Sequence, residues 1–175
     1  MKKLRLATLW LDGCSGCHMS LLDIDQRLLD LTRYYDVVYS PLMDIKVFPE
    51  AVDVALIEGA VSTDQDERTL HIVRRHTARL IALGDCAVTG NIPAMRNTSG
   101  ALEMLECVYG TSDQENATIP STDLPILRNK ALPLHRYVTV DHFIPGCPPP
   151  AETLLATLFA VAEGKTPCPN SRFGA

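Results

Sequence analysis

Short apolar segments recur along the chain, and each is followed by residues that favour a turn. Four of them lie at residues 4–11, 36–39, 54–57 and 80–83. Their length and continuous apolar character are typical of buried parallel strands, and segments with helical patterns separate them. Strands that alternate with helices through short loops predict a right-handed α/β domain, with a parallel sheet and helices on both of its faces.

The residues between the apolar segments predict the helices. Apolar residues at helical spacing begin at Met19 and continue to Leu31, which predicts one long amphipathic helix. Ser62 and Gln65 resemble a capping box that opens a second helix, ending near His76. Three further elements are expected: helices at residues 100–109 and 151–163, and a last strand at residues 137–140.

The length of 175 residues suits one well-buried domain. We expect this domain to span residues 1–164. Residues 110–134 are rich in polar residues and contain three prolines, so we expect them to form an irregular excursion over the surface. Residues 165–175 are expected to form a C-terminal tail.

The net charge of the chain argues against one class of function. Lys plus Arg number 16 against 21 for Asp plus Glu, and the resulting net charge of −5 argues against nucleic-acid binding, which usually needs a basic face. No apolar run is long enough to cross a bilayer, and the first residues lack the apolar region of a signal peptide. We therefore expect a cytoplasmic protein without a membrane span. In that reducing compartment, six cysteines favour metal or redox chemistry over disulfides.

Four of these cysteines follow predicted strands. Cys14 and Cys17 lie in the turn Gly-Cys-Ser-Gly-Cys, Cys86 follows the strand at 80–83, and Cys147 precedes three prolines. The carboxyl ends of parallel strands meet at one edge of a sheet, where ligands bind. A helix that begins beside the first pair would present amides and partial positive charge to thiolates. We therefore expect the four thiolates to converge on one metal centre.

Spacing alone leaves three interpretations of this centre. Four cysteines suit a four-iron cluster or a structural zinc ion. Structural zinc more often uses two close pairs, so one pair joined by two single cysteines favours the cluster. A thioredoxin-like dithiol explains Cys14 and Cys17 but gives Cys147 no role. The remaining cysteines, Cys107 and Cys168, are interpreted as packing or incidental thiols.

Other polar residues flank the predicted strand ends. Asp12, Glu58 and Asp85 are acids beside turns, where capping and solvation are the common roles and proton handling is the alternative. His18 directly follows Cys17 and is interpreted as a surface residue at a helix end; a hydrogen bond near the cluster and a subunit contact are the alternatives. The chain contains neither a G-x-G-x-x-G segment after its first strand nor a Walker A sequence.

These motifs together resemble the small subunit of nickel–iron hydrogenases. Residues 6–97 and 145–163 are most similar to the short small subunit of soluble, bidirectional NAD-reducing hydrogenases. The segments that carry the resemblance, in chain order, are Cys14-Ser15-Gly16-Cys17-His18-Met19-Ser20, Glu58-Gly59-Ala60-Val61, Gly84-Asp85-Cys86-Ala87, Asn91-Ile92-Pro93-Ala94-Met95-Arg96-Asn97 and Gly146-Cys147-Pro148-Pro149.

The resemblance implies a flavodoxin-like domain with one proximal [4Fe–4S] cluster, held by Cys14, Cys17, Cys86 and Cys147. In this family, hydrogen is activated at a nickel–iron centre in a separate large subunit. The chain would relay electrons between that centre and a diaphorase module, whose flavin and further clusters reduce NAD. The fold also permits a flavin mononucleotide near this domain, as thought for some relatives, although no residue here requires it.

The resemblance also defines the alternatives. The related quinone-reductase subunit of respiratory NADH dehydrogenase shares the Gly-Cys-Pro-Pro segment, but its first two cysteines are adjacent, whereas Ser15 and Gly16 separate them here. A stand-alone flavin- or zinc-binding α/β module is a further alternative. If electrons pass to a large subunit, the edge bearing the Cys14 loop and residues 95–97 should form an extensive interface.

Overall fold

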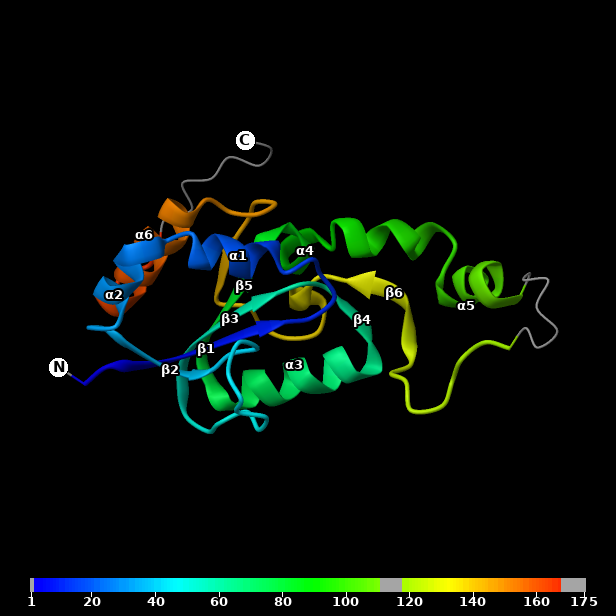
Figure 1. The fold of residues 1–175 in the computed structure, drawn as a ribbon, viewed down its shortest axis with the longest axis horizontal. Helices are drawn as coiled ribbons and strands as arrows, with labels where there is room; N and C mark the ends of the chain where they lie inside the picture. The colour runs from blue at the N-terminus through cyan, green and yellow to red at the C-terminus, as the bar shows by residue number, and fades with distance from the viewer. Residues whose placement is uncertain (1, 111–117, 168–175) are drawn as a thin grey trace.

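The computed structural model describes residues 2–110 and 118–167. Its largest feature is a five-stranded sheet in the order β2-β1-β3-β5-β7, in which every pairing is parallel. The strands are β1 (Leu4–Trp10), β2 (Tyr35–Tyr39), β3 (Val52–Glu58), β5 (Thr77–Leu83) and β7 (His142–Ile144). This arrangement confirms the parallel α/β fold predicted from the apolar segments (Figure 1).

Helices cover both faces of this sheet. One face carries α1 (Gly16–Leu22), α2 (Leu28–Leu31) and α6 (Ala151–Ala162), and the other carries α3 (Asp64–His76) (Figure 1). The short α4 (Gly84–Thr89) follows β5, and α5 (Ala101–Leu105) lies further along the chain. Turns of 3₁₀ helix lie at Asp25–Arg27, Ile92–Thr98 and Leu134–Arg136, and a π-helical turn lies at Glu106–Gly110.

The central strands are buried on both faces, which explains their continuous apolar sequence. In β3, Leu56 packs on the face covered by α6, while Ala55 and Ile57 pack on the face covered by α3. All three are at most 1% exposed. At about 25 cal/mol per Å² of apolar surface removed from water, this double burial is the main stabilising contribution to the sheet. A polar residue in the middle of β3 would leave a hydrogen-bonding group unsatisfied.

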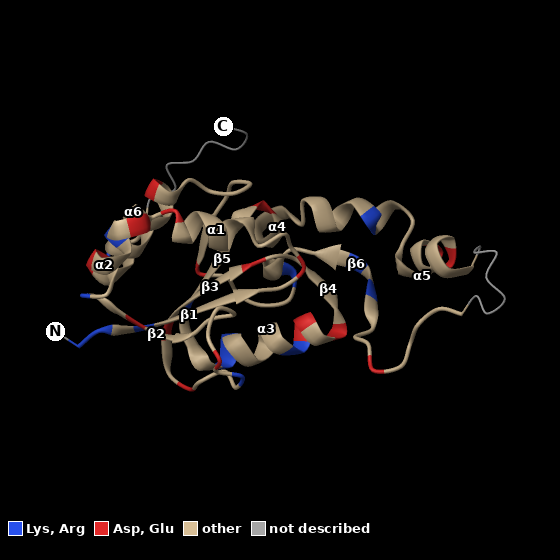
Figure 2. Cartoon of the chain, viewed as in Figure 1, with Lys and Arg blue, Asp and Glu red and all other residues tan. Residues whose placement is uncertain are grey.

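Helix α3 follows its sequence signals closely, as does α6 (Ala151–Ala162), which matches the helix expected at residues 151–163. The N-cap of α3 is Thr63, whose hydroxyl accepts a hydrogen bond from the Asp66 amide while the Asp66 carboxylate accepts one from the Thr63 amide. The predicted capping box therefore exists one residue further along, because Val61–Thr63 forms the short strand β4. Acidic residues occupy the first turn and basic residues the last (Figure 2). This arrangement stabilises the helix, because the charges compensate its dipole.

The single long helix predicted from Met19 to Leu31 is wrong. The chain forms α1, a 3₁₀ turn and α2 in succession, because Asp25 adopts a left-handed backbone conformation with φ of 57°. A left-handed residue ends the regular run of helical hydrogen bonds. The apolar residues of this stretch nevertheless pack in the core, since Ile24 and Leu31 are both buried against the sheet.

Two other expectations differ from the structure. The stretch expected to be irregular contains β6 (Leu127–Leu132), which pairs antiparallel with β4. The side-chain amide of Asn97 holds β6 in place: its Nδ2 donates to the Ala131 carbonyl, and its Oδ1 accepts from the Ala131 amide. The last strand of the large sheet is His142–Ile144 rather than residues 137–140. Tyr137, Val138 and Val140 pack against the core without entering the sheet, so their apolar character reflects burial.

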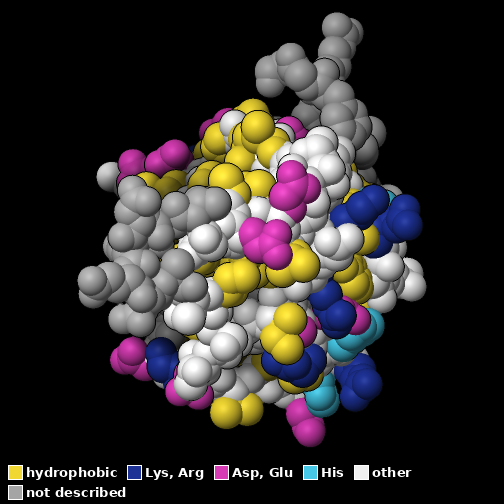
Figure 3. All heavy atoms as spheres, turned by 90° about the vertical axis from the view of Figure 1, so that its right-hand side faces the viewer, with side chains coloured by type: hydrophobic (Ala, Val, Ile, Leu, Met, Phe, Trp, Pro, Cys, Tyr) yellow, Lys and Arg dark blue, Asp and Glu magenta, His cyan; other side chains and the backbone are white. Residues whose placement is uncertain are grey.

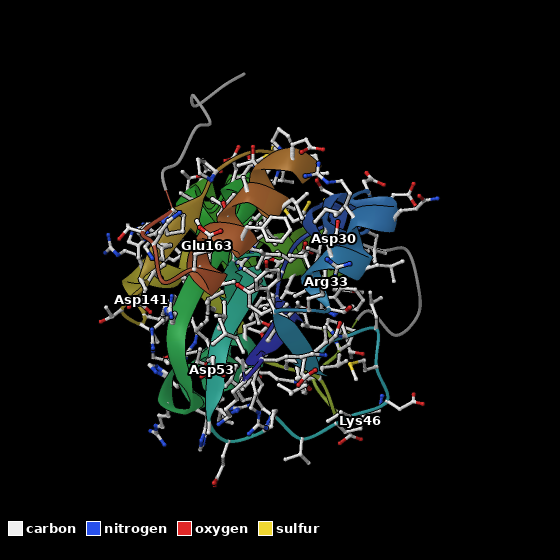
Figure 4. The ribbon with its side chains drawn as sticks, turned by 90° about the vertical axis from the view of Figure 1, so that its left-hand side faces the viewer. Asp30, Arg33, Lys46, Asp53, Asp141 and Glu163 are labelled. Carbon is white, nitrogen blue, oxygen red and sulfur yellow. The ribbon has the colours of Figure 1, made fainter. Side chains whose placement is uncertain are left out.

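The amino ends of the strands lie on the side shown in Figure 4. Asp53, at the start of β3, accepts a hydrogen bond from the Arg5 amide at 2.7 Å. Asp141, just before β7, accepts one from the Leu80 amide at 2.7 Å and one from the Arg74 guanidinium at 2.6 Å. These carboxylates join neighbouring strands and keep their ends level.

Candidate metal centre

The strands of the large sheet end in register at the edge opposite these carboxylates. Trp10 pairs with Glu58, Glu58 with Leu83, and Leu83 with Ile144. These four residues are the last of β1, β3, β5 and β7, so the loops that follow them begin at the same level. Three of these loops carry cysteines.

The four cysteines singled out in the sequence line one cavity at this edge. Cys14, Cys17, Cys86 and Cys147 surround a volume of about 90 Å³, together with Glu58, Asp85 and glycines of the loops after β1, β3 and β7. Cys14 and Cys147 are exposed, whereas Cys17 and Cys86 are half-buried. The thiols therefore meet in a shallow site at the surface, and its outer side is open.

Backbone hydrogen bonds join the loop after β1 to the loop after β3. The Asp12 amide donates to the Ala60 carbonyl at 3.1 Å, and the Ala60 amide donates back to the Asp12 carbonyl at 2.7 Å. The Leu11 amide also donates to the Glu58 carbonyl at 2.9 Å. Because Asp12 and Ala60 each donate a hydrogen bond to the other, these bonds fix the position of the chain that leads into Cys14.

A second set of bonds joins the Cys86 and Cys147 loops. The Asp85 carboxylate accepts a hydrogen bond from the Gly146 amide at 2.7 Å, and the Asp85 amide donates to the Gly146 carbonyl at 2.9 Å. The Ser20 hydroxyl of α1 donates to the Pro149 carbonyl. Asp85 thus joins two of the loops, and its carboxylate does not have the capping role expected for acids at this edge, because it bonds the Gly146 amide of another loop.

Gly84 leaves space for the sulfur of Cys17. A Cβ atom built on Gly84 would lie 2.2 Å from Cys17 Sγ, far inside van der Waals contact. The backbone of Gly84 also has φ of +80°, a conformation that side chains rarely adopt. The Cys17 side chain therefore occupies a position that only glycine at residue 84 permits.

His18 is buried, so the expectation that it is a surface residue is wrong. Its side chain is 3% exposed, and Glu58 is 2% exposed. The His18 amide donates to Glu58 Oε2 at 2.8 Å, and His18 Nδ1 lies 3.0 Å from the same oxygen. The Trp10 ring meets the imidazole edge-on at 5.4 Å between centroids. The buried carboxylate therefore fixes the residue that follows Cys17.

Burial and mutual repulsion govern the ionisation of the thiols. Burial raises the pKa of the Cys17 thiol, and the negative charge of Glu58 and the other three cysteines raises it further. Burial also raises the pKa of Cys86, with Cys147 adding to the effect, while hydrogen bonds from Ile92 and Asn91 partly oppose it. Four thiolates at this edge therefore need a positive centre among them.

Asn91 is a site residue that the sequence reasoning did not single out. Its side-chain Nδ2 donates to Cys147 Sγ at 3.4 Å. The signal was present, because Asn91 lies in a turn five residues after Cys86 and within a segment that carries the family resemblance. That signal named a segment, and only the fold shows which of its side chains reaches a sulfur.

The spacing of the four thiols around the cavity bears on the kind of metal group that they could hold. A zinc ion holds each sulfur at about 2.3 Å, so its four ligands must be closely grouped. Among the described residues, no three His, Cys, Asp or Glu side chains are grouped closely enough to hold one metal ion. Four thiols spread around a cavity fit a larger polynuclear group, whose iron atoms each take one cysteine.

Cys107 takes no part in this arrangement. Cys107 is exposed in the π-helical turn Glu106–Gly110 and does not line the cavity, so of the two roles expected for it, the incidental thiol fits and buried packing does not. Cys168 lies outside the described residues.

A profile of the family described as "NADH ubiquinone oxidoreductase, 20 Kd subunit" matches residues 14–161, a span that contains all four cysteines of the cavity. The chain belongs to this family. It lies in the superfamily that this 20 Kd protein forms with the small subunits of nickel–iron hydrogenases, as the sequence motifs predicted.

Components of hydrogenases are among the similar proteins. The chain is 41% identical over 168 residues to a component of the F420-non-reducing hydrogenase vhu of Methanococcus voltae, covering 94% of this chain and 58% of that protein. It is 36% identical over 171 residues to the delta chain of the NAD-reducing hydrogenase HoxS of Cupriavidus necator, covering 93% and 80%. The chain spans little more than half the length of the first of these relatives.

Solved structures agree with the fold. A chain of an NAD⁺-reducing [NiFe]-hydrogenase in the H2-reduced state superposes with a TM-score of 0.93 and 38% identity, covering 98% of this chain and 99% of that one. A [NiFeSe]-hydrogenase from Dm. baculatum, at 17% identity and a TM-score of 0.60, shares the fold. In the described part of this chain, no helix has the length and apolar character needed to span a membrane.

Proposed function

We propose that this chain is the electron-transfer small subunit of a cytoplasmic NAD-reducing nickel–iron hydrogenase, with one [4Fe–4S] cluster held by Cys14, Cys17, Cys86 and Cys147. The observation that carries the proposal is the convergence of four cysteine side chains, from three loops, on one cavity at the sheet edge. The choice of enzyme is supported by the TM-score of 0.93 and the 38% identity to a chain of an NAD⁺-reducing [NiFe]-hydrogenase.

The donor set fits this group. Four cysteines supply one thiolate to each iron, and a fully ligated cluster supplies one-electron transfer when bound, since none of its irons has a free position for substrate. The chain itself does the positioning. Asp85 joins two of the ligand loops, Glu58 fixes the residue after Cys17, and Gly84 leaves room for the Cys17 sulfur.

The open side of the site supports a partner subunit. Cys14 and Cys147 are exposed, and apolar residues around the same edge are exposed as well: Met19 (58%), Ile92 (63%) and Met95 (69%). Figure 3 views the side toward which the strands point and shows hydrophobic side chains among charged ones. We assign this edge to the large subunit that holds the nickel–iron centre, because electron transfer requires the cluster to lie close to that centre.

The remaining partner in the proposal is a diaphorase module that carries flavin and further clusters and passes electrons to NAD. A cytoplasmic location follows from this use of NAD. The fold class also accommodates a flavin mononucleotide on this chain, and flavin release on denaturing the separated subunit tests for it. Among the described residues, no set of donors for a flavin or for a second cluster is comparable to the four cysteines.

The cluster is tested by metal analysis of the purified complex and of two variants. Cys86→Ala removes one proposed ligand and should lower iron and acid-labile sulfide by about four atoms each, with loss of one EPR signal of the reduced protein. Cys107→Ala is the matched control, because it removes an exposed thiol away from the cavity and should leave both contents unchanged. Equal iron loss in both variants would contradict the ligand assignment.

The enzyme is tested by its electron acceptor. Hydrogen-dependent reduction of NAD by the purified complex supports the proposal. Hydrogen-dependent reduction of other acceptors alone would favour an enzyme like the F420-non-reducing hydrogenases to which the chain is also similar. NADH-dependent quinone reduction without hydrogenase activity would favour a quinone-reductase subunit. One zinc per chain and no EPR signal would exclude the cluster.

A further inference from the structure

The side chain of Asn91 is directed at the cysteines and not at the helix it precedes. Asn91 occupies the N-cap position of the 3₁₀ helix Ile92–Thr98, where an asparagine usually accepts a hydrogen bond from a helix amide. Its side chain makes no such capping bond in the described structure. Instead, Nδ2 donates to Cys147 Sγ at 3.4 Å.

The backbone holds Asn91 in an unfavourable conformation. Its φ of 36° and ψ of −127° lie in a region that favours glycine. Hydrogen bonds on both sides impose this conformation, since the Gly90 amide donates to the Cys86 carbonyl at 3.0 Å and the Ala94 amide donates to the Asn91 carbonyl at 3.1 Å. Strained residues of this kind cluster at functional sites, where their placement outweighs their cost.

The chemistry of the contact fixes its direction. A cysteine that ligates iron is a thiolate, which accepts hydrogen bonds and has none to donate. The amide of Asn91 therefore presents its N–H₂ group to the sulfur. When a cluster takes up one electron, the added negative charge spreads onto its sulfurs, and a donor stabilises the reduced form more than the oxidised form.

We propose that Asn91 raises the reduction potential of the cluster by donating an N–H···S hydrogen bond to the Cys147 sulfur. This inference rests on the proposed function, because it needs the four cysteines to hold a redox-active cluster. It makes Asn91 a positioning residue that adjusts electron transfer without touching substrate.

Two variants of Asn91 separate its side chain from its backbone. Asn91→Gly removes the donor while suiting the observed φ, so the fold and the cluster should be retained. Asn91→Asp keeps the shape of the side chain and replaces the donor with a charged acceptor. Thr98→Ala, at an exposed position of the same 3₁₀ helix, is the matched control, because the Thr98 hydroxyl donates to a local carbonyl, that of Met95.

The test is a redox titration of the purified complex followed by EPR, using the signal that Cys86→Ala abolishes. At the native midpoint potential, Asn91→Gly should lower the ratio of reduced to oxidised cluster about tenfold, which corresponds to about 59 mV for one electron. Asn91→Asp should lower it further, and Thr98→Ala should not change it. Pulsed EPR in deuterated buffer should show an exchangeable-proton coupling in the native complex that Asn91→Gly lacks.

Each outcome bears on one claim. If the iron content and the EPR signals of the native complex are unchanged in Cys86→Ala, the proposed function is overturned, and this inference with it. A loaded native complex whose potential is unchanged by both Asn91 variants overturns the inference alone. Loss of iron from Asn91→Gly would also overturn it, since the residue would then hold the cluster in place and not adjust its potential.

Discussion

The contact between Gly84 and Cys17 gives the sharpest prediction about the site. In Gly84→Ala, the new Cβ atom would lie 2.2 Å from Cys17 Sγ, so the sulfur would have to move by about 1 Å to regain van der Waals contact. Metal–ligand distances tolerate deviations of about 0.2 Å. A displacement this large should release Cys17 from the cluster and lower the iron and sulfide content of the purified chain.

The same substitution should also lower the stability of the fold. Alanine at a φ of +80° costs about 1–2 kcal/mol, and overpacking at a filled site costs about 1–3 kcal/mol more. A total of about 3 kcal/mol corresponds to a fall in Tm of roughly 6–12 °C for a chain of this size. Thermal denaturation measured by circular dichroism checks this value.

Gly164→Ala separates the two contributions. Gly164 has φ of +71°, yet a Cβ atom there would meet nothing within 4 Å. This variant should lose about 1–2 kcal/mol from the backbone alone and should keep its full iron content. If Gly84→Ala is no less stable than Gly164→Ala and retains all of its iron, the proposed position of the Cys17 sulfur is wrong.

Two further predictions concern the scaffold. Burial alone would raise the pKa of Asp141, but hydrogen bonds from the Leu80 amide and the Arg74 guanidinium hold it below its usual value. Asp141→Asn should therefore lower Tm at pH 7, and its deficit should shrink as the pH falls below about 4 through the folded-state pKa; a deficit independent of pH would refute this. Thr63→Ala removes the N-cap bond to the Asp66 amide and should cost about 1 kcal/mol, or roughly 2–4 °C in Tm, whereas an unchanged Tm would show that the cap adds nothing.

The sequence predicts the parallel sheet well because burial on both faces leaves a clear signal. Residues such as Leu56 and Ile57 must be apolar whichever face they meet, so β3 is a continuous apolar run. The position of Cys86 beside Cys14 and Cys17 follows from that sheet alone, since parallel strands end at one edge. Predicting where these cysteines meet therefore required few assumptions beyond the order of the strands.

The features that the sequence did not reveal depend on contacts distant in the chain. The break at Asp25 is a backbone conformation that apolar spacing does not encode. The burial of His18 depends on Glu58, which lies 40 residues away. Asn91 reaches a sulfur 56 residues further along. Each of these features arises when separate elements pack together, so local sequence patterns do not predict it.

The spread of the four cysteines along the chain has a consequence for biogenesis. The donors are supplied by loops after β1, β5 and β7, so the last of them joins the site only once residue 147 has been synthesised and β7 has paired with β5. A chain that stalls or misfolds before that point has an incomplete set of sulfurs. Insertion of the proposed cluster would therefore require a chain that has been translated past residue 147 and folded through β7.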